Sequence, residues 1–138
     1  MERGQAGVIV SDLLHLDTHI VVWLYAGEHH RFPPQVRQRL NNDRLRYSPM
    51  VALELTYLHE TGKVTDPAAT IIDELSSAVG LAADTQEFSL VITIAERLDF
   101  SRDPFDRIIV AQAIATDAAL ITKDERILAT YPHTTFWR

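Results

Sequence analysis

Residues 103–124, DPFDRIIVAQAIATDAALITKD, form a helix-to-strand unit with an acidic residue at each end. Asp103 is a favourable helix N-cap, the proline after it suits the first turn, and Asp106 stands where a capping-box acid would. Apolar residues then recur at helical spacing, and an apolar strand at 119–122 is followed by Asp124. Such a unit is typical of an α/β domain with a parallel sheet.

The same alternation of helices and strands extends towards both ends of the chain. Turn signals and apolar spacing predict the following elements: strands at 13–17, 45–48, 80–83 and 134–137, helices at 18–26, 33–40, 48–62, 67–79 and 87–98, and a turn at 123–126. We therefore expect one domain over residues 13–138, built on a central parallel sheet. Residues 1–12 are expected to be a loose N-terminal leader.

Composition excludes several classes of protein. A chain of 138 residues, 46% of them hydrophobic, is long enough to bury a core without staples. Cysteine is absent, which excludes disulfides and thiolate metal sites and fits a reducing cytoplasm. No stretch approaches the roughly 20 apolar residues of a membrane span, so no membrane role is expected.

The net charge of −6 is unusual for a protein that binds nucleic acid. Basic residues are nevertheless concentrated in one segment, which contains Arg31, Arg37, Arg39, Arg44 and Arg46. This run has two interpretations, a solvated helix face or a patch that contacts phosphates. The sequence leaves both open.

Four acidic residues are expected at one edge of the sheet. Asp17 closes the first strand, and Asp124 follows the strand at 119–122 by two residues. Helices that follow parallel strands begin at this edge, which brings Asp106 there and Glu54 within reach. Taken alone, three of these acids have a simpler explanation: Asp17 suits an N-cap, Glu54 a surface position and Asp124 a turn.

A cluster of carboxylates at one place requires compensation. Two unit charges 4 Å apart repel by about 4 kcal/mol at an effective dielectric constant of 20, so a cation or shared protons must offset them. Oxygen ligands favour Mg²⁺, with Mn²⁺ as a substitute, over zinc. Such an ion activates water and stabilises charge on a phosphoryl group. The residues alone thus predict a metal-binding α/β domain.

Four ordered motifs resemble those of PIN domains, and specifically of VapC-type toxins. They are residues 16–20 (LDTHI), 48–55 (SPMVALEL), 103–113 (DPFDRIIVAQA) and 120–124 (LITKD). Residues 136–137 are similar to the family's last strand. The resemblance covers residues 13–138, and it implies a PIN-like three-layer α/β/α fold.

The resemblance also implies a function. PIN toxins of this type are Mg²⁺-dependent endoribonucleases, commonly homodimeric, that a cognate VapB-like antitoxin neutralises. Carried over by position, the catalytic residues are Asp17, Glu54, Asp106 and Asp124, with Asp17 and Asp106 as the metal ligands. Secondary candidates are Thr18 and Thr122, which would orient the site, and Asp103. Asp106 is preferred to Asp103 because its 18-residue spacing to Asp124 fits the family better.

Other interpretations remain open. The chain could be a PIN nuclease in RNA processing without an antitoxin, or a catalytically silent α/β binding module. The histidines do not have the spacing of a metal site, and His15 and His19 are expected to be packing or solvent-facing residues. A small basic DNA-binding protein encoded just upstream would favour the toxin.

Overall fold

A single parallel sheet organises the computed structural model, which describes residues 12–138. Within these residues the sheet has five strands in the order β3-β2-β1-β4-β5, and every neighbouring pair is parallel. The strands are β1 (Leu13–Leu16), β2 (Arg44–Tyr47), β3 (Ala82–Ala83), β4 (Ala119–Ile121) and β5 (Thr135–Phe136). The predicted parallel sheet is therefore confirmed.

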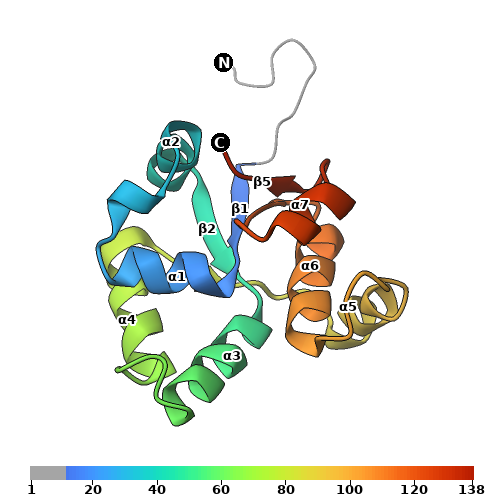
Figure 1. Cartoon of the computed structure of the whole chain (residues 1–138), viewed down its shortest axis with the longest axis horizontal. Helices are drawn as coiled ribbons and strands as arrows, with labels where there is room; N and C mark the ends of the chain where they lie inside the picture. The colour runs from blue at the N-terminus through green and yellow to red at the C-terminus, as the bar shows by residue number, and fades with distance from the viewer. Residues whose placement is uncertain (1–11) are drawn as a thin grey trace.

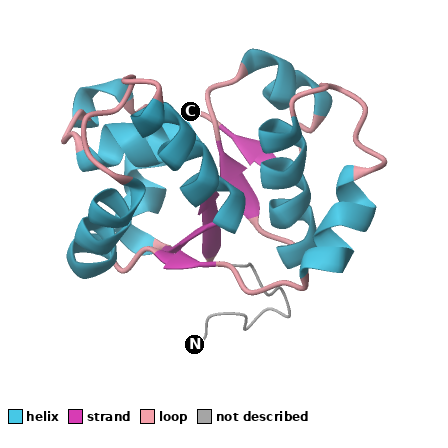
Figure 2. Cartoon of the chain, turned by 90° about the horizontal axis from the view of Figure 1, so that it is seen from below, coloured by secondary structure: helices cyan, strands magenta, loops and turns pink. Residues whose placement is uncertain are grey.

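Helices cover both faces of the sheet (Figures 1 and 2). They are α1 (Thr18–Tyr25), the 3₁₀ turn η1 (His29–Arg31), α2 (Pro34–Asn42), α3 (Pro49–Glu60), α4 (Ala68–Val79), α5 (Phe88–Ala95), α6 (Pro104–Thr116) and α7 (Glu125–Thr130). The central strand β1 shows the layering directly, because Leu14 and Leu16 are buried on one face and His15 on the other. The expected three-layer α/β/α fold is confirmed.

Local signals set where the main helices begin. Ser48 caps α3 by accepting a hydrogen bond from the backbone N–H of Met50 at 3.1 Å. Asp103 caps α6 by accepting one from the N–H of Phe105 at 2.8 Å. A proline at the start of each helix cannot donate a backbone hydrogen bond and needs none there. Both helix starts agree with the sequence analysis.

Two short elements of the structure were not predicted from the sequence. Residues 123–126 do not form a simple turn, because Asp124 caps helix α7 and accepts hydrogen bonds from the N–H groups of Arg126 and Ile127. The helix was missed because it is short and only Ile127 is buried, so no apolar period is visible. The 3₁₀ turn η1 was also not predicted.

The start of the domain is only partly described. Residues 1–11 of the predicted leader lie outside the described residues. Asp12 adjoins the sheet: its backbone carbonyl accepts from the N–H of Arg44 at 2.8 Å, and its carboxylate forms an ion pair with the same arginine. Within residues 12–138, no helix is both long and apolar enough to cross a membrane.

Candidate active site

A cavity of about 420 Å³ opens at the carboxyl ends of β1 and β4. Its wall includes all four predicted catalytic acids as well as Asp103 and Thr122. The lining residues are Asp17, His19, Ile20, Trp23, Glu54, Asp103, Asp106, Thr122, Lys123 and Asp124. The predicted convergence of acids on one edge of the sheet is therefore confirmed.

Asp17 is held by the register of the two central strands. Leu16 lies opposite Ile121, so the residue after β1 comes beside the residue after β4. The Asp17 carboxylate accepts from the backbone N–H of Thr18 at 2.8 Å and from the hydroxyl of Thr122 at 2.7 Å. Burial nevertheless raises the pKa of Asp17, against the effect of these two hydrogen bonds.

Glu54 reaches the same edge from α3. Its carboxylate Oε1 accepts a hydrogen bond from the hydroxyl of Thr18 at 2.5 Å. Thr18 is itself buried at the start of α1, directly after Asp17. Burial raises the pKa of Glu54, and the nearby Asp17 and Asp103 raise it further. Thr18 and Thr122, the predicted orienting hydroxyls, thus each hold one acid of the cavity.

Asp106 lies in the first turn of α6 and lines the cavity. The sequence places Asp106 where a capping-box acid would bond the N–H of Asp103, but that N–H donates to the hydroxyl of Ser101 at 3.0 Å. The expected capping box is therefore not made. Asp103 has the predicted N-cap geometry, although its side chain also lines the cavity.

Burial and four neighbouring acids strongly perturb the pKa of Asp106. Its pKa is raised to about 7, first by burial and then by the negative charges of Asp103, Asp17, Glu54 and Asp124. Without a cation, Asp106 therefore holds its proton over much of the acidic range. The repulsion anticipated for clustered carboxylates is present in the structure.

Asp124 completes the wall from the start of α7. Its Oδ1 accepts from the N–H groups of Arg126 and Ile127 at 2.9 and 3.1 Å, while its own N–H donates to the hydroxyl of Thr122 at 3.1 Å. Thr122 therefore bonds both Asp17 and the backbone of Asp124. One buried hydroxyl fixes the relative positions of two cavity acids.

The donor set fits a hard divalent cation. Every acidic group in the cavity offers oxygen atoms, and the pKa of Asp106 is raised first by burial and then by neighbouring negative charge, which a cation would offset. Across residues 12–138, no group of three or more His, Asp or Glu side chains is arranged as a ready-made metal site. Mg²⁺ commonly uses only one or two carboxylates with several waters, so Asp17 and Asp106 would be enough protein ligands for such an ion.

Comparison with known proteins identifies the family. A family model described as PIN domain matches residues 14–132. The chain belongs to the PIN domain family. No curated protein matches the chain.

Solved structures share the fold of this PIN domain. A chain in the crystal structure of VapBC2 from Rickettsia felis, bound to a DNA fragment from its promoter, is 17% identical, with a TM-score of 0.64 over 91% of this chain and 99% of that one. VapBC-1 from nontypeable Haemophilus influenzae matches at 17% identity and a TM-score of 0.58, over 90% of this chain and 96% of that one. DNA-bound VapBC from Salmonella typhimurium matches at 19% identity and a TM-score of 0.58, over 88% of this chain and 91% of that one.

Four lining residues of this PIN domain were not singled out as site residues by the sequence, and the buried Ile20 is one of them. His19 and Trp23 are one helical turn apart on α1, the helix that begins at the cavity edge, and Lys123 lies between Thr122 and Asp124. Helical spacing after a strand-ending acid is the signal that indicates His19 and Trp23.

Three of the five arginines in the basic run form ion pairs with acidic residues. Arg31 pairs with Glu28, Arg39 with Asp43 and Arg44 with Asp12. The structure therefore favours the solvated-face interpretation for most of the run. Arg31 differs in also lying over the ring of Trp23, with its guanidinium carbon 4.9 Å from the ring centroid.

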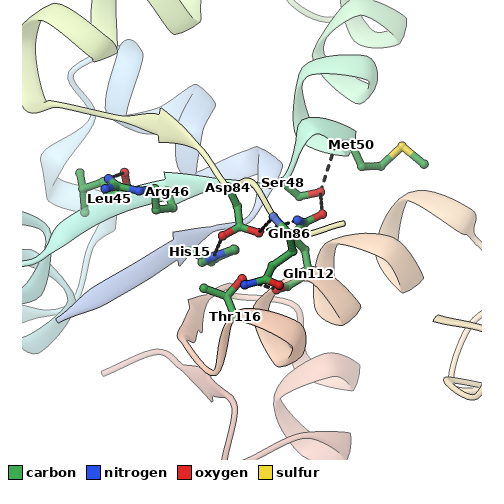
Figure 3. Close-up of polar contacts among 9 residues, drawn as sticks. All are labelled: His15, Leu45, Arg46, Ser48, Met50, Asp84, Gln86, Gln112 and Thr116. Atoms are coloured by element: carbon green, nitrogen blue, oxygen red, sulfur yellow. Dashed lines mark hydrogen bonds and ion pairs between the residues drawn. The ribbon is translucent and has the colours of Figure 1, made fainter. Parts of the chain in front are cut away.

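His15 is a packing residue, as expected. It is 1% exposed, and its Nε2 lies 3.6 Å from Oδ1 of Asp84 without a hydrogen-bond partner in the described chain (Figure 3). Burial lowers the pKa of His15. A neutral imidazole in the sheet core does not contribute to the acidic cavity.

Proposed function

We propose that this PIN domain is a Mg²⁺-dependent endoribonuclease that acts as the toxin of a toxin–antitoxin pair. The proposal depends chiefly on one observation, the five carboxylates around a single cavity with the pKa of Asp106 raised to about 7. A purely structural acidic patch has no reason to hold like charges in a partly buried hollow. The reducing cytoplasm is the expected compartment.

The side chains of the cavity would have different roles in such a site. Asp17 and Asp106 would hold the cation, and Glu54 and Asp124 would add negative charge and accept hydrogen bonds from water. Thr18 and Thr122 would keep two of these carboxylates aimed at the cavity, as their hydrogen bonds do now. Mg²⁺ would supply positive charge against the phosphoryl oxygens and would acidify an attacking water.

A protein partner is part of the proposal. The similar structures are VapBC complexes, two of them bound to DNA, so a VapB-like antitoxin encoded beside this chain is the expected partner. We also expect a homodimer, which light scattering of the purified protein would test. A PIN nuclease without an antitoxin and a catalytically silent module are the alternatives.

Incubating purified protein with total RNA tests the activity. We expect new RNA ends at defined positions in Mg²⁺, no cleavage in EDTA, and recovery with Mg²⁺ or Mn²⁺ in excess of the chelator. Mapping these ends would identify the substrate. Cleavage that persists at full rate in EDTA would refute the metal-dependent mechanism, and an absence of cleavage with every RNA would favour the silent module.

A further inference from the structure

The negative charge of the cavity would repel an RNA substrate. Five carboxylates line it, and RNA brings a further negative charge with each phosphate. One cation would offset only part of this repulsion. Positive groups that face the substrate are therefore needed beside the acids, and the lining contains one lysine, Lys123.

Lys123 is placed for contact with an anion. It is exposed, it lies between Thr122 and Asp124, and its Nζ is 5.2 Å from the centroid of the Trp23 ring. Among residues 12–138 its ammonium group forms no ion pair and no hydrogen bond. Its three donors are thus available at the mouth of the cavity.

A second cation, Arg31, also lies against the ring of Trp23. The guanidinium of Arg31 lies 4.9 Å from the Trp23 centroid, and only its Nε is engaged, in a 2.6 Å hydrogen bond to Glu28. The Trp23 ring is held by Phe32 and Trp137, whose centroids are 6.4 and 6.3 Å away. A fixed indole thus limits the freedom of two long cationic side chains.

We infer that Lys123 and Arg31, positioned on Trp23, form a phosphate-binding site that holds the RNA backbone at one side of the acidic cavity. The inference rests on the proposed function, since it assigns the substrate contact of the same site. Contacts to phosphate position a strand without reading its sequence. The exposed ammonium of Lys123 and guanidinium of Arg31 suit an anion, whereas the basic tail expected of an antitoxin would pair with the carboxylates inside the cavity.

Binding of a short fluorescein-labelled single-stranded RNA of mixed sequence tests the site. The measurement uses anisotropy in Mg²⁺ with Asp17→Asn protein, so that cleavage does not consume the probe. Adding Lys123→Met should weaken binding about five- to tenfold and reduce the slope of log Kd against log salt by about 0.7, the value for one contact to a single strand. Arg31→Met should have a similar effect.

Lys63→Met is the matched control, because Lys63 is exposed and does not line the cavity. It should leave both the affinity and the salt slope unchanged. In the otherwise wild-type protein, Lys123→Met should raise KM for RNA cleavage and leave kcat nearly unchanged. Removal of an exposed side chain should not alter the melting temperature, so a folding defect would not imitate this result.

The outcomes separate this inference from the proposed function. If Lys123→Met and Lys63→Met bind RNA equally well with the same salt slope, the phosphate site is wrong, even where wild-type protein cleaves RNA. If Lys123→Met weakens only binding to the antitoxin, the surface contacts protein and the inference is also overturned. If the wild-type protein cleaves no RNA while Lys123 still determines RNA binding, the proposed activity fails and the anion site is supported.

Discussion

The negative charges of the other four cavity acids all act on Asp106. It is half-buried, it is surrounded by Asp103, Asp17, Glu54 and Asp124, and its pKa lies at about 7. Asp103, three residues earlier, lines the same cavity but is bound to the backbone as an N-cap. The two acids therefore have different expected roles, although they share a helix turn.

The pair Asp106→Asn and Asp103→Asn tests this distinction. Asp106→Asn should lower the rate of RNA cleavage by more than about 100-fold and should weaken Mg²⁺ binding. A loss of this size exceeds the roughly 10- to 100-fold expected when a residue that only orients a metal ligand is removed. Asp103→Asn should lower it less than about tenfold, because Asn is an equally good N-cap and keeps the helix start intact. Rates and calorimetric Mg²⁺ titrations would be measured side by side. Equal losses for the two variants would place both acids at the metal.

The raised pKa of Asp106 also predicts a pH-dependent stability. The folded, metal-free protein holds a proton that the unfolded chain, with a pKa near 3.8, releases, so its stability falls as the pH rises from about 4 to about 7. Asp106→Asn removes this effect and should raise the melting temperature in EDTA by a few degrees at about pH 8, and less at about pH 4.5. A lower melting temperature for the variant at the higher pH would contradict this electrostatic account.

At the scale of elements, a buried polar network joins the helices that carry the acids. Gln112 of α6 accepts a hydrogen bond from Ser48, the cap of α3, at 3.0 Å and donates one to Asp84 at 2.6 Å (Figure 3). Although burial raises the pKa of Asp84, hydrogen bonds from Gln112, Thr116 and Gln86 keep it below its usual value. The network ties the start of α3 to the middle of α6.

Gln112→Met should therefore destabilise the fold by about 1–3 kcal/mol, because it leaves buried polar partners unsatisfied while preserving volume. Urea unfolding should show a lower midpoint with an unchanged m-value. Gln35→Met, at an exposed position on α2, is the control and should change little. A midpoint for Gln112→Met equal to that of the control would show that the network contributes nothing to stability.

The elements also show what the sequence could predict. Capped, proline-led helices such as α3 and α6 were predictable because their signals are local, and the cavity acids because strand ends of a parallel sheet share one edge. Helix α7 was not, since six residues with one buried position give no period. The Trp23–Lys123 contact joins distant segments through side-chain geometry, which spacing along the chain does not encode.

At the scale of the whole molecule, negative charge gathers around the cavity to which we assign the substrate. The chain carries a net charge of −6, and five of its acids line one cavity. This distribution suits inhibition by a partner that inserts a Lys or Arg among the carboxylates in competition with Mg²⁺. The segment 18–40, which includes Trp23, is the expected docking region.

Binding of the protein encoded beside this chain tests that mode of inhibition. The complex should form at low salt and weaken as salt rises, and excess Mg²⁺ should partly restore RNA cleavage. Deleting the partner's basic tail should abolish inhibition, which parallel binding and cleavage assays would detect. Inhibition that survives this deletion would refute insertion of a positive side chain.

The most direct test of the central claim is the cleavage rate of Asp17→Asn. Asp17 directly follows the central strand β1, its carboxylate is held by hydrogen bonds from Thr18 and Thr122, and it is the first proposed metal ligand. With RNA in saturating Mg²⁺, the account predicts a loss of more than about 100-fold, with a melting temperature at least equal to that of the wild type because a buried charge is removed. A correctly folded Asp17→Asn protein that cleaves RNA as fast as the wild type would contradict the account.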